Sequence, residues 1–346
     1  MSINTYYSWH EAEWRRLWEA ANGLPHALLL AGPAGVGKSR FGMALVQRLL
    51  CSAPRKPEEP ACGDCPSCRL FASGNHPDFR HVVPEAEAAE AEGETDADKK
   101  KASSQILIAQ IRALEDFVYV GGHLSSRRAI LIEPAEAMNA AAENALLKIL
   151  EEPPSGVCFV LVSDRWRKLL PTIRSRCRSV VFGRPGLAEA QRWLAEQGGD
   201  KALPLLSITG GAPIRALEEF EKGRMKAYED VAASLFDNGG DFLELAGRWE
   251  GHVKKDGGFK MEDIVSMVQR ALFDLASMAM TGKLHFFTGR ERQAEAIVKR
   301  ADVEGILAYY GEMLRARALS SHPLNPRLFL DDIAARYLRA IAPSRS

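Results

Sequence analysis

A glycine-rich segment near the start of the chain has the residue types and spacing of a phosphate-binding loop, or P-loop. The residues that match the pattern G-x-x-x-x-G-K-[ST] are Gly32, Pro33, Ala34, Gly35, Val36, Gly37, Lys38 and Ser39. The glycines let backbone N–H groups curl toward phosphate oxygens, the lysine reaches the outer phosphates, and the hydroxyl can ligate Mg²⁺. The segment therefore predicts binding of ATP or ADP with Mg²⁺. The alternative is a chance glycine-rich turn.

A compact group of cysteines follows. Of the six cysteines, four have the spacing C-x10-C-x2-C-x2-C, and these are Cys51, Cys62, Cys65 and Cys68. Two residues between cysteines let both thiolates turn onto one ion, and four thiolates form a closed tetrahedral site of the structural kind. The spacing predicts a structural Zn²⁺ ion, with free thiols or an iron–sulfur cluster as the alternatives. His76 lies nearby in the sequence but is surplus to four ligands.

ATP hydrolysis requires acids as well as a phosphate loop. A second buried strand usually ends in an acid that holds Mg²⁺, and a neighbouring carboxylate commonly activates water. Here the apolar run 129–132 ends at Glu133, which is followed by Pro134. Glu133 is a candidate Mg²⁺ ligand, but proline has no acid–base group, so we expect at most weak hydrolysis by this chain alone. Glu136 is a candidate substitute, although we expect it to be an exposed surface acid.

Strands and helices alternate around these residues. Short apolar runs predict buried strands at 26–31, 78–83, 129–133, 157–163 and 179–182. Helical spacing of apolar residues predicts helices at 38–50, 106–120 and 139–152. Such alternation is typical of an α/β fold, a parallel sheet with helices on both faces. It also gives the P-loop its proper context, since a strand precedes the loop and a helix follows it.

The pattern of alternation ends near residue 183, and the rest of the chain has helical character. We therefore expect a nucleotide-binding domain at 1–183, a small helical domain at 184–224 and an all-α domain at 225–346. The first domain would contain the cysteine module at 51–68 and a flexible acidic insert at 85–104, which lacks large apolar residues. Apolar positions such as Ile264 and Leu272 fit either a helix core or a subunit interface. Aromatic residues such as Trp9 and Trp14 either pack on the sheet or contact a partner.

Composition and charge limit the classes of function. The 45 basic and 45 acidic residues give a formal net charge of zero, whereas a protein that grips DNA alone usually carries a basic excess. We therefore expect any role on DNA to be shared within an assembly. The first residues do not resemble a signal peptide, and no apolar run reaches the ~18 residues of a membrane span. These features favour a cytoplasmic protein without a membrane partner.

Further segments resemble one family, the subunits of bacterial clamp loaders of the AAA+ type. These segments are 144–154, NALLKILEEPP; 172–177, TIRSRC, with its Ser-Arg-Cys motif; and 210–215, GGAPIR. The cysteine-rich insert behind the P-loop helix also resembles this family, and the resemblance covers roughly residues 20–220. It implies that the helical region at 184–224 is a lid and that 225–346 is a collar domain for oligomerisation. It also implies a five-subunit ring that opens a sliding clamp and loads it onto primed DNA.

The resemblance also implies roles for single residues. Arg176 would be an arginine finger, a catalytic residue that acts in trans on the ATP of a neighbouring subunit. Ser163 would sense the γ-phosphate, and Arg215 would be the lid arginine that contacts nucleotide in the same chain. Each has a simpler alternative: an ion pair with a surface acid for Arg176, a strand end for Ser163, and an exposed helix start for Arg215.

Among clamp-loader subunits, the combination of Arg176, an intact P-loop and Pro134 is similar to the delta-prime type. A subunit of that type is a stator, which lends a finger in trans without being a competent ATPase. The implied partners are the gamma/tau motor and the clamp-opening delta subunit in a hetero-pentamer, together with the sliding clamp and primed DNA. Some delta-prime chains have lost the P-loop, and this chain departs from them.

Two alternatives from other classes stay open. One is an active AAA+ clamp-loader ATPase similar to gamma/tau, and the other is an autonomous zinc-dependent DNA-binding protein. The cysteine spacing lacks the histidine pair of DNA-reading zinc fingers. The sequence contains no paired-carboxylate polymerase signature, so we expect DNA polymerase (nucleotidyltransferase) activity only in a DNA polymerase III holoenzyme that the chain joins.

Overall fold

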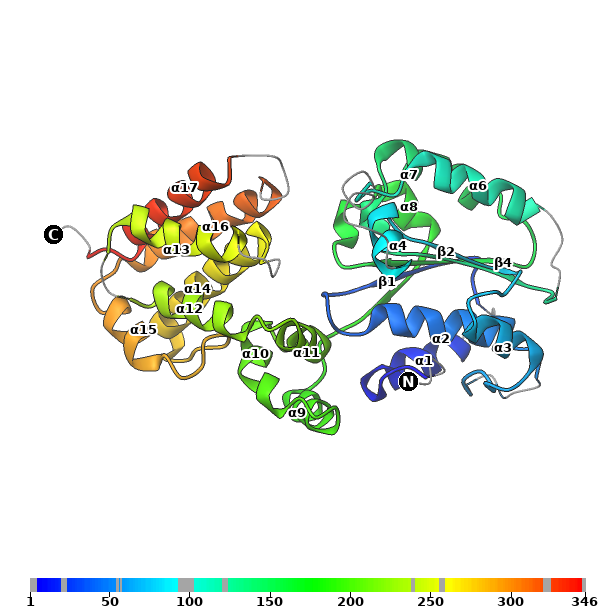
Figure 1. Cartoon of the computed structure of the whole chain (residues 1–346), viewed down its shortest axis with the longest axis horizontal. Coiled ribbons are helices and arrows are strands. Elements are labelled where there is room, and N and C mark those ends of the chain that lie inside the picture. Colours follow the sequence, from blue (N-terminus) through cyan, green and yellow to red (C-terminus); the bar gives the residue numbers. More distant parts are fainter. Residues whose placement is uncertain are drawn as a thin grey trace. The chain divides into compact units, whose positions relative to one another are not determined.

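The structure is a computed structural model that describes residues 5–19, 24–53, 56, 58–92, 103–119, 124–237, 240–254, 259–319 and 325–343. The chain forms two compact units, Met1–Pro185 and Gly186–Ser346 (Figure 1). The first unit contains a parallel sheet between helices, and the second unit is helical. The expected division of the second unit into separate domains at residue 224 stays a prediction.

The first unit is built on one parallel sheet. Its strands are β1 (Ala27–Ala31), β2 (Phe79–Val82), β3 (Arg128–Ile132), β4 (Val157–Ser163) and β5 (Arg178–Val181). Their order across the sheet is β2-β3-β4-β1-β5, and every neighbouring pair is parallel. Every residue of β1, β3 and β4 is buried, as expected where helices cover both faces. The α/β fold class predicted from the sequence is confirmed.

Two helical layers cover the sheet (Figure 1). One layer contains α1 (Glu11–Trp18), α2 (Lys38–Leu50) and α3 (Pro66–Ala72), and the other contains α6 (Ile108–Tyr119), α7 (Ala140–Glu151) and α8 (Pro171–Arg176). Alternate residues of each strand enter opposite layers, so Leu28 packs in one core and Leu29 in the other. Short 3₁₀ helices lie at η1 (Ser8–His10), η2 (Ala135–Ala137) and η3 (Trp166–Lys168).

Helix α4 (Glu85–Glu92) lies where the sequence analysis expected a flexible acidic insert at 85–104. The segment has no apolar face to bury, but alanine and glutamate are strong helix formers. The acidic residues Glu85 and Glu87 in its first turn also complement the helix dipole. Residues 93–102, which belong to the same expected insert, lie outside the described part of the chain.

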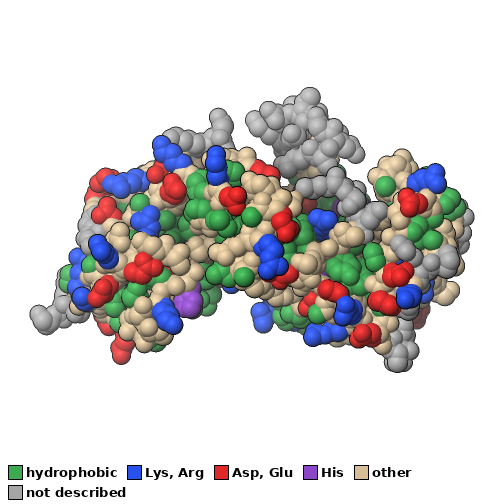
Figure 2. All heavy atoms as spheres, turned by 90° about the horizontal axis from the view of Figure 1, so that it is seen from below, with side chains coloured by type: hydrophobic (Ala, Val, Ile, Leu, Met, Phe, Trp, Pro, Cys, Tyr) green, Lys and Arg blue, Asp and Glu red, His purple; other side chains and the backbone are tan. Residues whose placement is uncertain are grey.

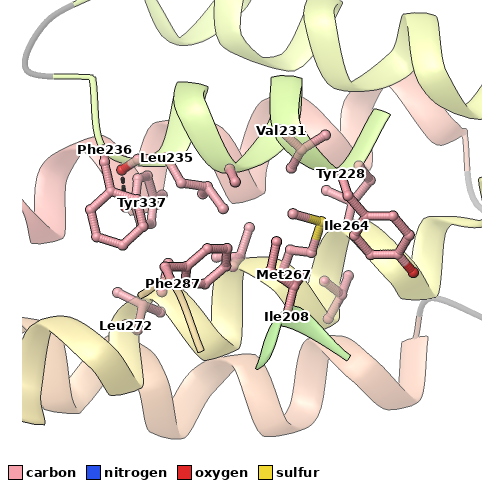
Figure 3. Close-up of a cluster of buried hydrophobic side chains, with 14 of the residues drawn as sticks. Ile208, Tyr228, Val231, Leu235, Phe236, Ile264, Met267, Leu272, Phe287 and Tyr337 are labelled. Carbon is pink, nitrogen blue, oxygen red and sulfur yellow. Dashed lines mark hydrogen bonds between the residues drawn. The ribbon is translucent and has the colours of Figure 1, made fainter. Parts of the chain in front are cut away.

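The second unit consists of helices around one core. The helices are α9 (Leu187–Glu196), η4 (Asp200–Ala202), α10 (Leu203–Ile208), α11 (Pro213–Glu221), α12 (Met225–Leu235), α13 (Phe242–Lys254), α14 (Met261–Thr281), α15 (Glu291–Val298), α16 (Val303–Leu319) and α17 (Pro326–Ala340). In Figure 3, side chains of α12 and α14 face one another, and the Tyr337 hydroxyl donates to the Leu235 carbonyl at 2.5 Å. The sequence analysis left open whether Ile264 and Leu272 belong to a helix core or to a subunit interface. Both are fully buried within this unit.

The surface agrees with the balanced composition. On the face seen in Figure 2, acidic and basic side chains are interspersed. Within the described residues, no helix is long and apolar enough to cross a membrane.

Gly32 connects β1 to the P-loop at a crowded point of the sheet. Its N–H donates to the Ser163 carbonyl of β4 at 3.3 Å, and the preceding Ala31 carbonyl accepts from the Phe182 N–H at 2.8 Å. A Cβ atom at Gly32 would lie 2.6 Å from the Phe182 carbonyl oxygen, which belongs to the backbone and cannot rotate away. The start of the loop is therefore confined by both strands that flank β1.

We expect Gly32→Ala to lower the free energy of unfolding by about 1–3 kcal/mol, because the added methyl group overpacks this junction. Denaturant unfolding of the purified chain measures the change. Gly183→Ala is the matched control, since a Cβ at Gly183 meets nothing within 4 Å. Equal losses of stability in the two variants would contradict the steric argument.

Candidate functional site

The P-loop lies between β1 and α2 and has the backbone that its glycines permit. Gly35 and Gly37 have positive φ angles of 73° and 97°, a region that other residues rarely adopt. Gly37 is the N-cap of α2, so the helix begins at Lys38 and directs its first N–H groups toward the loop. This geometry is that of an anion-binding helix N-terminus.

An N-terminal aromatic residue forms a hydrogen bond with the P-loop, a contact that the sequence analysis did not predict. The Trp9 indole N–H donates to the Val36 carbonyl at 2.9 Å. Trp9 also stacks on Tyr7 with a centroid separation of 4.6 Å, and the Arg40 guanidinium of α2 lies over the Tyr7 ring. Trp14 is fully buried in the core on the α2 side of the sheet. These aromatic residues therefore pack within the first unit.

Lys38 has two partners inside the protein. Its side chain is 3% exposed, and its ammonium group donates to the Pro33 carbonyl at 2.7 Å and to the Asp164 carboxylate at 2.5 Å. Asp164 was not among the predicted site residues. The available signal was its place directly after strand β4, because the carboxyl ends of parallel strands share one edge of the sheet.

Glu133, Ser39 and Asp164 line one cavity of about 390 Å³. Glu133 Oε1 lies 2.8 Å from His81 Nε2, a partner that the sequence analysis also missed. Glu133 Oε2 is buried and has no hydrogen-bond partner among the described residues. A buried carboxylate oxygen without a partner is costly unless a cation or donor meets it, and oxygen donors of this kind suit Mg²⁺. The predicted Mg²⁺ ligands Ser39 and Glu133 thus line the same cavity and both offer oxygen donors, the kind that Mg²⁺ prefers, and their role toward the ion stays a prediction.

Glu136 is not the exposed surface acid that the sequence analysis expected. Its side chain is 4% exposed, and Oε1 accepts the backbone N–H groups of Asp164 at 3.1 Å and Arg165 at 3.0 Å. The interpretation was wrong because η2 turns Glu136 toward the loop that follows β4. The carboxylate therefore anchors the loop that carries Asp164.

Ser163, the predicted γ-phosphate sensor, is the last residue of β4 and is fully buried. Its register partner in the sheet is Ala31, the residue before the P-loop. Within the described residues the Ser163 hydroxyl has no hydrogen-bond partner, which leaves a donor and an acceptor unsatisfied next to the loop. Its role toward nucleotide stays a prediction.

The two predicted arginines have partners in different units. Arg176 ends α8 in the first unit, where its side chain is 33% exposed and donates to Glu151 at 2.7 Å and to the Thr172 carbonyl at 3.0 Å. Arg215 belongs to α11 in the second unit and donates to Asp263 of α14 at 2.8 Å. Burial lowers the pKa of Arg215, but Tyr228 and Asp263 outweigh it and raise the pKa. The roles of both arginines toward nucleotide stay predictions.

The four predicted cysteines converge at the end of α2, with all Sγ atoms within 4.8 Å of one another. Three Sγ–Sγ distances are 3.6, 4.0 and 3.8 Å, for Cys51–Cys62, Cys51–Cys65 and Cys62–Cys68. A disulfide would require about 2.05 Å. A tetrahedral ion with metal–sulfur bonds of about 2.3 Å would separate its ligands by roughly 3.8 Å, so the cluster fits a four-thiolate site.

Backbone and side-chain hydrogen bonds support the cysteine cluster. Backbone N–H groups of Cys62, Cys65 and Cys68 donate to Sγ atoms of Cys51, Cys62 and Cys65 at 3.3–3.5 Å. Burial raises the pKa of the Cys65 thiol, but hydrogen bonds with Ser52 and Cys68 outweigh it and lower the pKa to about 5. The lowered pKa favours the thiolate of Cys65, which is the form that binds metals, whereas burial raises the pKa of the Cys68 thiol in the same cluster.

His76 is not part of the cysteine cluster. It is buried, its Nδ1 accepts the Asp78 N–H at 3.1 Å, and its Nε2 lies 2.8 Å from the Ser67 hydroxyl. Ser67 in turn donates to the Leu50 carbonyl at the end of α2. Because Nδ1 is an acceptor, the neutral ring carries its proton on Nε2. This histidine therefore links α3 to the strand that follows, and the prediction that it is surplus to the ligands agrees with these contacts.

Comparison with known proteins points to one family. The family model described as "DNA polymerase III, delta subunit" matches residues 12–185. The chain is 38% identical over 214 residues to DNA polymerase III subunit delta′ of Pseudomonas aeruginosa, covering 61% of this chain and 60% of that protein. It is 31% identical over 252 residues to subunit delta′ of Yersinia pestis, covering 69% of each chain.

A relative with a different subunit name also matches. The chain is 28% identical over 362 aligned positions to DNA polymerase III subunit gamma/tau of Mycobacterium tuberculosis, covering 92% of this chain and 57% of that protein. The match therefore spans only about three fifths of the length of the Pseudomonas and Mycobacterium relatives.

Proposed function

Because the chain belongs to the family of DNA polymerase III delta-prime subunits, we propose that it is a stator of a clamp loader in DNA replication. In this role it binds the gamma/tau motor and the delta subunit in a five-subunit AAA+ ring, which loads a sliding clamp onto primed DNA. The chain contributes an arginine finger and binds ATP or ADP with Mg²⁺ at its own P-loop. The relatives' names support the family context, and the residues below support the specific role.

The observation that carries the proposal concerns Glu133, Pro134 and Glu136, which follow β3 in the described part of the chain. Pro134 occupies the position next to Glu133, where a neighbouring carboxylate commonly activates water. Glu133 contacts His81, and Glu136 accepts two backbone N–H groups of the β4–η3 loop. Glu136 Oε1 is thus engaged in holding the loop that follows β4. In the proposed role, the P-loop keeps the residues for binding, while neither Glu133 nor Glu136 serves as an efficient base for hydrolysis.

Arg176 has the properties of a finger that acts outside its own chain. It ends α8 at the surface, and its guanidinium is partly exposed beside Glu151. A guanidinium donates in a planar fork to phosphate oxygens, and in a neighbour's ATP site it would stabilise the charge that develops on the transferring phosphoryl group. Arg176 exchanges Glu151 for that phosphate in the proposed assembly.

The second candidate is an ATPase motor, favoured by the intact P-loop and by the similarity to the gamma/tau relative. Pro134 and the anchored Glu136 weigh against it. We expect ATP turnover by the purified chain to be at least about tenfold slower than turnover by a motor subunit, since general-base catalysis contributes roughly 10²–10⁴-fold. Steady-state phosphate release measures this rate. Motor-like turnover that Lys38→Ala abolishes would establish the second candidate instead.

Arg176→Ala should lower the DNA-stimulated ATP turnover of the reconstituted complex several-fold, because one motor site loses its finger, an interaction worth roughly 10³–10⁵-fold at a single site. Phosphate release by the complex on primed DNA measures the loss. Arg178→Ala is the matched control, since Arg178 is an exposed arginine two residues away, in β5. Arg176→Lys should also be slow, because lysine lacks the planar fork. Full turnover in Arg176→Ala would exclude the finger.

We further propose that the four cysteines hold a structural Zn²⁺ ion. The sulfur distances fit a tetrahedral four-thiolate site, and such a closed site leaves no position for substrate. The ion would bind α2 through Cys51 to α3 through Cys68, in a segment with few core residues of its own.

The zinc proposal predicts about one Zn²⁺ per chain by elemental analysis after extensive dialysis. Cys65→Ser should lose the metal and lower the midpoint of thermal unfolding, because ligand loss removes binding energy that stabilises the folded segment. Cys158→Ala is the control, since Cys158 is a buried residue of β4 outside the cluster and should keep the metal. Iron in place of zinc, or no metal in the wild type, would refute this assignment.

A further inference from the structure

The ion pair between Lys38 and Asp164 supports a further inference about the P-loop. This inference rests on the nucleotide binding that is proposed above. We propose that Asp164 competes with nucleotide phosphate for the Lys38 ammonium group and thereby sets the affinity of the P-loop for nucleotide. Asp164 is then a positioning and regulatory residue of the site.

The sheet register places Asp164 beside the P-loop. Ala31 of β1 pairs with Ser163 of β4 in parallel, and the Gly32 N–H donates to the Ser163 carbonyl. The residues that follow these two strand ends are the start of the P-loop and Asp164. Both segments therefore leave the sheet at the same edge, and the Asp164 carboxylate meets Lys38 of the P-loop.

Contacts independent of Lys38 hold the Asp164 backbone. Its N–H and that of Arg165 both donate to Glu136 Oε1, and the Glu136 side chain is almost fully buried. The backbone of Asp164 would therefore keep its place when the carboxylate leaves Lys38. Only the side chain needs to rotate, and because it is 43% exposed it can turn into water.

Asp164 and a nucleotide phosphate are both negatively charged and would compete for the ammonium group of Lys38. An ammonium group has three donors, and Pro33 and Asp164 already accept two of those of Lys38. A phosphate that meets Lys38 must displace the carboxylate or lie close to it. Because Asp164 also borders the cavity with Ser39 and Glu133, its negative charge opposes a nearby polyphosphate through like-charge repulsion, which weakens binding until the carboxylate leaves.

The test is equilibrium binding of ADP and of ATP to the purified full chain, each with and without Mg²⁺. Asp164→Asn keeps the shape of the side chain and removes its charge. We expect the Kd for both nucleotides to fall roughly five- to tenfold, with or without Mg²⁺, as expected for loss of a partly exposed ion pair. Asp116→Asn is the control for net charge, since Asp116 is exposed on α6, and its Kd should equal that of the wild type.

A double-mutant cycle tests whether the effect passes through Lys38. In a Lys38→Ala background, whose fold is checked by circular dichroism, Asp164→Asn should lower the Kd by much less than it does in the wild-type background, because only the direct repulsion of phosphate remains. Thermal unfolding gives a readout without activity. Asp164→Asn should unfold at a lower temperature than the wild type, because the buried Lys38 charge loses its partner, and saturating ADP should raise its midpoint by more than that of the wild type.

Other outcomes overturn the inference. An unchanged Kd excludes competition, and weaker binding only when Mg²⁺ is present would identify Asp164 as a metal ligand instead. No measurable binding by either the wild type or Asp164→Asn would refute both nucleotide binding and the competition. That result would leave the arginine-finger proposal standing, because the Arg176 assay depends on the neighbour's nucleotide.

Discussion

The parallel pairing of β1 with β4 is the constraint on which the candidate site depends. The register of Ala31 with Ser163 brings the start of the P-loop and the end of β4 to one edge of the sheet. Lys38 can then meet Asp164, and Gly32 must be small because β5 closes on its other side. A shift of one residue in this register would turn every side chain of β4 to the opposite layer of the core. The chemistry of the loop is therefore fixed by the burial of apolar residues in the strands.

Most of the fold could be predicted from local patterns in the sequence. Continuous apolar runs identify buried parallel strands, and helical spacing identifies the covering helices, because each pattern reports burial within a few residues. The P-loop and the cysteine module are also local, since their ligands lie within short segments. Helix α4 escaped prediction because it has no apolar face and depends on backbone propensity alone.

The contacts that define the site could not be predicted from local sequence patterns. Asp164 meets Lys38 across 126 residues, His81 meets Glu133 across 52, and Trp9 meets Val36 across 27. Such pairs follow from strand order and register, which a single sequence does not specify. Glu136 was misjudged for the same reason: an acid in a polar segment is usually exposed, and only the tertiary contact with the β4–η3 loop explains its burial.

The position of β1 in the sheet has a consequence for synthesis of the chain. β1 is made first among the strands, yet both of its neighbours, β4 and β5, come more than a hundred residues later. Until those residues leave the ribosome, the apolar strand Ala27–Ala31 has neither an edge to pair with nor a complete layer to cover it. Contacts of such long sequence separation form slowly and leave apolar segments exposed to aggregation. In a nascent chain, α1 and α2 are made next to β1 and can cover only the face that carries Leu28 and Leu30, whereas Leu29 waits for helices of the opposite layer.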